Sequence, residues 1–217
     1  NRVFIRNFGT LVILTIVFGV GFGVLMAVGK DRLPDHVLGT FSTVALSGPG
    51  FWIAIVLIFI FAEQWKILPS SGISDGFGFI LPAITLALPS IGVCARLTRS
   101  AILDEIGRQY MTVADAKGMS RRRAVIRHAF GNALIPIITY LGNHMAGIIG
   151  GASIVETIFA IPGIGSYAIA GVQSKDYYVV QAYVLFSGCI YVLTNILIDL
   201  IYIALDPKIR AGEAVES

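Results

Sequence analysis

The chain contains none of the residue spacings that usually carry catalysis. Its three histidines, His36, His128 and His144, lie far apart, and neither a nucleophile triad nor a zinc-type spacing is visible. The phosphate-binding pattern G-x-x-x-x-G-K-[ST] is absent as well, because Gly29-Lys30 is followed by aspartate and lacks the first glycine. We therefore expect no enzyme active site and no cofactor on this chain, so ATP must bind elsewhere if ATP is used.

Asn143 and His144 are nevertheless unusual, because they lie near the middle of an apolar run over residues 132–154. An ionisable side chain in mid-membrane is costly and by default suggests a transport path or site. A neutral imidazole hydrogen-bonded across helices is the alternative, and the sequence does not choose between the two. If the cargo is a metal such as nickel, a neutral imidazole is a suitable transient ligand. His144 is thus a candidate both for the path and for transient metal binding.

A polar, basic stretch over residues 110–136 separates two of the long apolar runs. Gly118 can end a first short helix in the left-handed conformation, and Ser120 suits the N-cap of a second helix. Arg121, Arg122 and Arg123 would then occupy the first turn of that second helix, where cations oppose the helix dipole. Local stability does not explain them, so they are expected to contact either anionic lipid headgroups or a cytoplasmic partner.

The composition is that of an integral membrane protein. Of 217 residues, 56% are hydrophobic and only 13% are charged, whereas a soluble domain has about twice that share of charge. Cys94 and Cys189 lie inside apolar runs without a C-x-x-C spacing, which favours packing roles. Because the chain starts at Asn1 without methionine or a signal-peptide pattern, we expect it to be part of a longer subunit.

Five apolar runs are long enough to cross a bilayer. The chain is therefore predicted to be an all-α polytopic membrane protein, with one transmembrane domain over residues 1–217. Pro49, between two glycines in the second run, predicts a kink or local unwinding there, and Pro82 and Pro89 interrupt the third. The predicted spans are about residues 8–28, 37–62, 79–102, 132–154 and 179–205, with a loop over 105–131 and a turn-rich, re-entrant or external segment over 155–178.

Alternation of these five spans places the basic stretch, the loop at residues 29–36 and the C-terminal tail on one side of the membrane. Only Arg2, Arg6, Lys66 and Lys175 of the sixteen lysines and arginines then lie on the other side. This asymmetry makes the side of the basic stretch cytoplasmic. Arg96 and Arg99 are expected to reach the interface by snorkelling.

The basic stretch resembles the cytoplasmic coupling loop of ABC-importer permeases, which carries the pattern E-A-A-x-x-x-G. Aligned on Gly118, the family glutamate falls on Thr112, and Asp115 is acidic but out of register. The spacing Ala114-x-Ala116-x-Gly118, followed by Asn132-x-Leu134-x-Pro136, is similar to the peptide/nickel branch, which often lacks that glutamate.

The resemblance covers nearly the whole chain. Further segments look like those of peptide/nickel permeases in the same order, and residues 31–35 with Phe51-Trp52 look more nickel-like than peptide-like. Members normally have one more N-terminal helix and an extracytoplasmic segment before this core. The matching segments are Pro49 with Phe51-Trp52, Leu68-Pro69 with Gly72, Glu156 with Phe159-Ala160-x-Pro162-Gly163-x-Gly165, and Leu205-Asp206-Pro207-x-Ile209-Arg210.

The resemblance implies one of two permease subunits of an ABC importer in a bacterial or archaeal inner membrane. A homologous permease, two cytoplasmic ATPases that bind ATP and Mg²⁺, and an extracytoplasmic binding protein would be its partners. It would have no nucleic-acid partner. The cargo would be nickel, a nickel chelate, or a di- or oligopeptide. The residues implied for ATPase coupling are Thr112, Ala114, Asp115, Ala116, Gly118, Arg121, Arg122 and Arg123, and the candidates for the path or its gates are Pro49, Trp52, Asn143, His144 and Glu156.

Two other classes of protein compete with this interpretation. A secondary transporter would show inverted repeats and several midplane acids, but no repeat is found and Asp199 is the only acid within a predicted span. A structural membrane subunit without a pore would not need His144. Co-purification with an ATPase would separate the importer from both.

Overall fold

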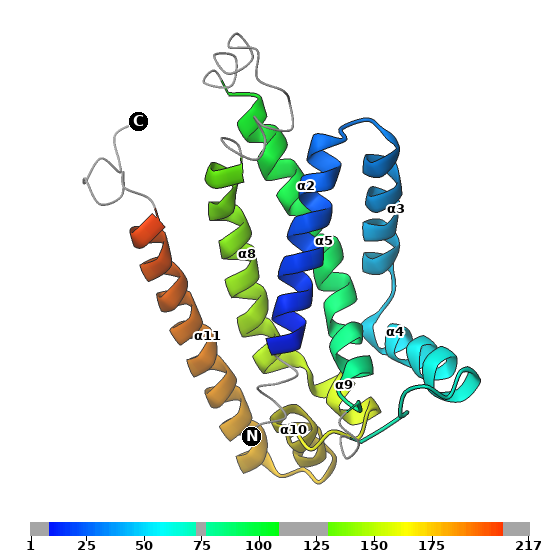
Figure 1. The fold of residues 1–217 in the computed structure, drawn as a ribbon. Coiled ribbons are helices and arrows are strands. Elements are labelled where there is room, and N and C mark those ends of the chain that lie inside the picture. Colours follow the sequence, from blue (N-terminus) through cyan, green and yellow to red (C-terminus); the bar gives the residue numbers. More distant parts are fainter. Residues whose placement is uncertain (1–8, 73–76, 109–129, 206–217) are drawn as a thin grey trace.

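The computed structural model describes residues 9–72, 77–108 and 130–205, and all regular structure within these ranges is helical. Long helices run side by side, and three shorter ones, α4, α9 and α10, lie across one end of the bundle (Figure 1). The elements are η1 (Thr15–Val20), α2 (Gly21–Val28), α3 (Leu33–Ser47), α4 (Gly50–Leu57), η2 (Ile58–Gln64), α5 (Ile80–Ile106), α8 (Phe130–Gly151), α9 (Ser153–Ile158), α10 (Ile164–Gln173) and α11 (Tyr177–Leu205).

Helix α5 is the centre of the bundle. It packs against η1, α2, α3 and α8, and over half of its apolar span is buried inside the chain, compared with 6% for α11. Small side chains such as Ala87, Cys94 and Ala95 face its neighbours and are almost completely buried. Because small residues let helix backbones approach closely, α5 can have close neighbours on several sides.

The tightest of these contacts is made by Gly19 and Gly23. A Cβ atom at Gly23 would lie 2.4 Å from Thr98 Cβ and 2.7 Å from the backbone oxygen of Ala95, and one at Gly19 would lie 2.7 Å from Cys94 Cβ. The G-x-x-x-G spacing in the first apolar run therefore serves packing within the chain, against α5.

The predicted span 37–62 is not one straight crossing. The helix breaks where the sequence predicts it, at Pro49, but α3 and the following α4–η2 segment are bent by 103°. Gly48 and Pro49 both have extended backbone conformations, and the proline ring has no N–H to donate to the preceding turn. The first part of the run therefore crosses the bundle as α3, while α4 turns across its end (Figure 1).

The third run, in contrast, is not interrupted by its prolines. α5 is continuous from Ile80 to Ile106 and contains Pro89 in its interior. Pro82 lies in the first turn, where a backbone N–H would have no helical partner in any case. The interior proline is tolerated because α5 is packed on several sides by other helices.

Among the residues that the structure describes, three helices are long and apolar enough to cross a membrane: Gly9–Val28, Ile80–Ile106 and Tyr177–Leu200. The bent pair formed by α3 and α4–η2 would add a fourth. The predicted run 132–154 forms α8, which has 22 residues and packs between α5 and α11. The structure thus has a helix in each of the five predicted runs.

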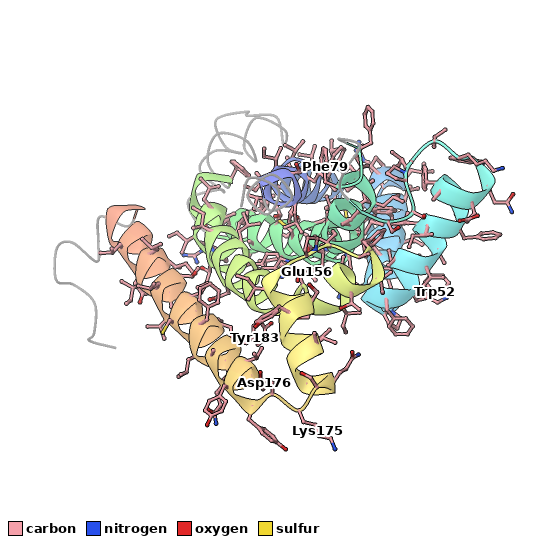
Figure 2. The ribbon with its side chains drawn as sticks, turned by 90° about the horizontal axis from the view of Figure 1, so that it is seen from below. Trp52, Phe79, Glu156, Lys175, Asp176 and Tyr183 are labelled. Carbon is pink, nitrogen blue, oxygen red and sulfur yellow. The ribbon has the colours of Figure 1, made fainter. Side chains whose placement is uncertain are left out.

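The connections agree with the predicted alternation of sides. The loop between α2 and α3, the end of α5 and the start of α8 all lie at one end of the bundle, opposite α4, α9 and α10 (Figure 1). Lys30, Arg32 and Arg108 belong to that end, and Lys175 lies at the opposite end (Figure 2). We call the first the inner end and the second the outer end, following the predicted orientation.

Candidate functional site

His144 lies on α8 and is held against α5. Its Nε2 atom is hydrogen-bonded to the hydroxyl oxygen of Ser90, and its ring stacks on that of Tyr140 with 5.3 Å between ring centroids. The Tyr140 hydroxyl donates to the backbone oxygen of Ser90 at 3.3 Å. Two side chains of α8 therefore converge on Ser90, just after the interior Pro89.

The Ser90 hydroxyl joins its own helix to α8. The Ser90 hydroxyl donates to the backbone oxygen of Leu86 at 2.7 Å. The same hydroxyl oxygen is hydrogen-bonded to Nε2 of His144 on α8. This arrangement is the interhelical hydrogen bond that the sequence left as the alternative for His144.

The described residues hold no set of metal ligands. No group of three or more histidine, cysteine, aspartate or glutamate side chains lies close enough there to bind a metal ion. Asn143, beside His144 in sequence, is exposed on the surface of α8. His144 alone would be a single imidazole ligand, so within this part of the chain only transient metal contact is compatible with the arrangement.

Glu156 is buried between α9 and α10 at the outer end (Figure 2). Its Oε2 atom accepts a hydrogen bond from the backbone N–H of Ser166 at 2.8 Å, in the first turn of α10. The carboxylate lies so close to Gly163 that a Cβ atom there would be 2.3–2.5 Å from its carbon and oxygens. Glu156 thus satisfies a free amide in the first turn of α10.

Trp52 lies on α4, just after the break at Pro49, and 56% of its surface is exposed. Its side chain is at the outer edge of the bundle in the view from the outer end (Figure 2). Trp52 and Glu156 therefore both lie at the outer end, whereas His144 lies between the long helices α5 and α8.

An ion pair that the sequence analysis missed joins α3 to α5 near the inner end. Arg99 binds Asp35 through two hydrogen bonds, Nε to Oδ1 at 2.6 Å and Nη2 to Oδ2 at 2.7 Å. Asp35 is 7% exposed, and it also accepts from the backbone N–H of Asp31 at 3.0 Å. Arg99 does not simply extend to the interface as predicted. The first turn of α3, with Pro34 followed by an acid, was the available signal for a helix start that places Asp35 toward the bundle.

This ion pair borders a cavity of about 500 Å³ between α2, α3 and α5. Arg96 lines the same cavity one turn before Arg99, and it makes no ion pair with any residue that the structure describes. The cavity is lined by Met26, Asp31, Asp35, His36, Gly39, Thr40, Thr43, Val44, Arg96 and Arg99.

The residues predicted for ATPase coupling lie between Ile106 and Phe130, where the described residues have a gap over 109–129. Thr112, Ala114, Asp115, Ala116, Gly118, Arg121, Arg122 and Arg123 all fall in this gap. Their prediction rests on the sequence, together with the position of α5 and α8, which flank the gap at the inner end.

These features define a polytopic, all-helical membrane protein with a central helix and a broken α3–α4 segment. A sequence profile described as "Binding-protein-dependent transport system inner membrane component" matches residues 19–211. The chain therefore belongs to this family of ABC-transporter inner-membrane permeases, as the resemblance of its motifs implied.

Curated relatives agree with this assignment. The chain is 39% identical over 206 residues to a probable peptide ABC transporter permease protein, y4tP, of Sinorhizobium fredii, a match covering 91% of the chain. It is 34% identical over 201 residues to the glutathione transport system permease protein GsiC of Escherichia coli strain K12, covering 93% of the chain. The chain spans 66% of the length of each relative, or about two thirds.

A solved structure has the same fold. The MetNI methionine ABC transporter, in inward-facing conformations, contains a chain that matches with a TM-score of 0.69 over 93% of this chain and 95% of the other. The identity of 16% supports a common fold only.

Proposed function

We propose that this chain is a permease subunit of an ATP-driven ABC importer and forms half of a translocation path. The observation that carries the proposal is the family match over residues 19–211, which covers the central helix and both helices that flank the predicted coupling loop. A homologous permease would complete the path. Two ATPase subunits would bind ATP and Mg²⁺, and an extracytoplasmic binding protein would deliver the cargo.

The cargo proposed is a short peptide or a peptide-like molecule. Both relatives described above are named for such cargo, one for peptides and one for glutathione. Nickel or a nickel chelate, which residues 31–35 and Phe51-Trp52 favour by resemblance, is the second candidate. His144 would be its transient ligand through Nδ1, because Nε2 is bonded to Ser90.

The proposed coupling mechanism relies on the segment between α5 and α8. Each of its ends continues a helix that packs in the centre of the bundle, so a displacement of the segment would be transmitted to α5 and α8. Thr112, Ala114, Asp115 and Ala116 would lie in the first helix of the segment and Gly118 at its turn, while the three arginines that follow would face the ATPase.

The test is co-purification and transport with this protein co-expressed with a candidate partner permease, candidate ATPases and a candidate binding protein. We expect an ATPase to co-purify, and we expect uptake of a radiolabelled dipeptide to require both ATP and the binding protein. Gly118→Val should allow assembly but uncouple ATP hydrolysis from uptake, because Gly118 is predicted from the sequence to be a turn position without room for a side chain. Ion-driven uptake without any ATPase, or normal uptake by Gly118→Val, would contradict this mechanism.

The cargo is tested separately with His144→Ala. Peptide uptake by this variant should be nearly normal, whereas a nickel importer would lose nickel uptake while keeping assembly and basal ATPase activity. His144→Gln should behave like the parent if only the hydrogen bond to Ser90 matters. If the parent protein takes up nickel and His144→Ala abolishes that uptake, nickel is the cargo.

A further inference from the structure

Helix α3 has three distinct faces. Asp35 and Ser42 are buried against the bundle, and Leu33 and Val37 are exposed apolar residues on the adjoining side, each more than half exposed. A third face is both exposed and polar. It consists of His36, Thr40, Thr43 and Ser47, which follow one another at helical spacings of four, three and four residues.

This polar face covers most of the length of α3. His36 and Ser47 are eleven positions apart, which corresponds to about 16 Å along a helix at about 1.5 Å per residue. The hydroxyl groups of Thr40, Thr43 and Ser47 donate to backbone oxygens of their own helix, at 2.8, 3.0 and 2.8 Å. Their oxygen atoms remain able to accept further hydrogen bonds. The row from His36 to Ser47, which we call the α3 polar face, thus presents acceptors along its whole length.

Contact between such a polar row and lipid hydrocarbon is energetically unfavourable. Polar and ionisable side chains within membrane-spanning segments normally face the protein interior or a water-filled cavity. α3 already has exposed apolar side chains that suit lipid, Leu33 and Val37. The polar side chains gather in one row, and three of them line the cavity, which indicates that this row borders water rather than lipid.

The inner end of the α3 polar face opens into the 500 Å³ cavity, which His36, Thr40 and Thr43 line together with Arg96 of α5. Arg99 is occupied by Asp35, but Arg96 is exposed and makes no ion pair with any described residue. Asp31 lines the cavity as well, and its carboxylate is likewise without an ion pair in the described part of the chain.

The cavity is thus lined by a cation from α5 and by an anion from the turn between α2 and α3, and neither side chain is in an ion pair with a described residue. A short peptide has the complementary pair, a terminal carboxylate and a terminal ammonium group. The volume lies within the range of about 300–1,000 Å³ that is usual for small-molecule sites.

We propose that the α3 polar face is one wall of the water-filled path and that the cavity at its inner end binds a short zwitterionic peptide transiently. Arg96 binds the terminal carboxylate, since guanidinium and carboxylate pair through two parallel hydrogen bonds, and Asp31 receives the terminal ammonium group. The hydroxyl oxygens of Thr40 and Thr43 accept from peptide N–H groups. The assignment rests on the proposed function, because it requires that the path carry peptides.

The first experiment tests whether the wall borders water. Thr40→Cys and Val37→Cys are made in a Cys189→Ser background, since Cys189 is the exposed cysteine and Cys94 is buried. The assembled complex in nanodiscs is treated with a charged, water-soluble thiosulfonate, and labelling of this chain is read by mass spectrometry. The two positions lie within one turn on the same helix, so depth is matched. We expect Thr40→Cys to react at least tenfold faster than Val37→Cys.

The second experiment tests the ligand. Alanyl-alanine should protect Thr40→Cys from labelling, and its C-terminal amide should protect much less. Arg96→Gln should raise the half-protecting concentration of alanyl-alanine about tenfold or more, the usual effect of losing a hydrogen bond to a charged group, without changing that of the amide. Arg96→Lys should restore part of the difference.

Equal reactivity of Thr40→Cys and Val37→Cys would overturn the wall assignment, and so would failure of both to react, which would indicate a dry interface or lipid. Labelling without protection by alanyl-alanine would overturn the peptide site. If either result occurs while ATP-dependent dipeptide uptake persists, the importer function stands and only this assignment fails.

Discussion

The close approach of α2 to α5 can be tested by comparing substitutions at two nearby glycines of α2. Gly23 and Gly21 lie two residues apart on α2 and therefore face different sides of the helix. A Cβ atom at Gly23 would lie 2.4 Å from Thr98 Cβ and 2.7 Å from the carbonyl oxygen of Ala95, whereas one at Gly21 would have no neighbour within 4 Å. Gly23→Ala and Gly21→Ala thus add the same methyl group in a crowded and in an open place.

The expected magnitudes have opposite signs. Replacing a helical glycine by alanine stabilises a helix by roughly 0.5–1 kcal/mol when there is space, so Gly21→Ala should be neutral or stabilising. At Gly23 the same gain is opposed by overpacking, which costs about 1–3 kcal/mol. The upper part of that range applies because one of the clashing atoms is a backbone oxygen, which cannot rotate away. The free energy of unfolding should therefore fall by about 1–2 kcal/mol for Gly23→Ala.

The assay is thermal unfolding of the purified complex in one detergent, followed by the intrinsic fluorescence of this chain or by aggregation. At roughly 2–4 °C per kcal/mol for a chain of this size, Gly23→Ala should lower Tm by several degrees. Gly21→Ala should leave it unchanged or raise it. Equal Tm values for the two variants, or a gain for Gly23→Ala, would refute the close approach of α2 to α5.

Two further pairs of changes test other contacts by the same measurement. Asp35→Asn should destabilise the protein by roughly 1–3 kcal/mol, less than for a fully buried pair because Arg99 is about one third exposed. Adding Arg99→Gln should then recover part of the loss, and additive losses would show that the two side chains do not interact. Gly163→Ala should lower Tm by several degrees because its Cβ would collide with the Glu156 carboxylate, whereas Gly188→Ala, which meets nothing within 4 Å, should not. Equal effects at the two glycines would contradict the buried position of Glu156.

Local features of the fold could be predicted from the sequence because local chemistry determines them. The five apolar runs and the position of the break at Pro49 followed from hydrophobicity and from the missing proline N–H. The bend of 103° did not follow, since its size depends on where α4 packs against α5 and α9. The same packing explains why Pro89 was wrongly expected to interrupt α5: a proline weakens a helix locally, but surrounding helices keep it continuous.

The candidate site was less predictable because it depends on residues far apart in sequence. Asp35 and Arg99 are separated by 64 positions and Ser90 and His144 by 54. No periodicity in a single sequence indicates which partners such residues will find. The burial cost of His144 could be foreseen from its depth, but its partner could not.

The contacts of α5 also restrict how the chain can change shape. At Gly23 the backbone of α2 touches that of α5, and a Cβ atom at Gly92 of α5 would lie 2.7 Å from the backbone oxygen of Ser42 in α3. Helices locked at this distance cannot slide past each other by shear, because any shift would bring larger side chains against a rigid backbone. The contact between α8 and α11 differs, since at Gly142 the nearest atoms belong to the flexible side chain of Ile198. In the proposed importer, transitions between inward- and outward-facing states should therefore move α2, α3 and α5 as one rigid body, with the relative displacement taken up at the contact between α8 and α11.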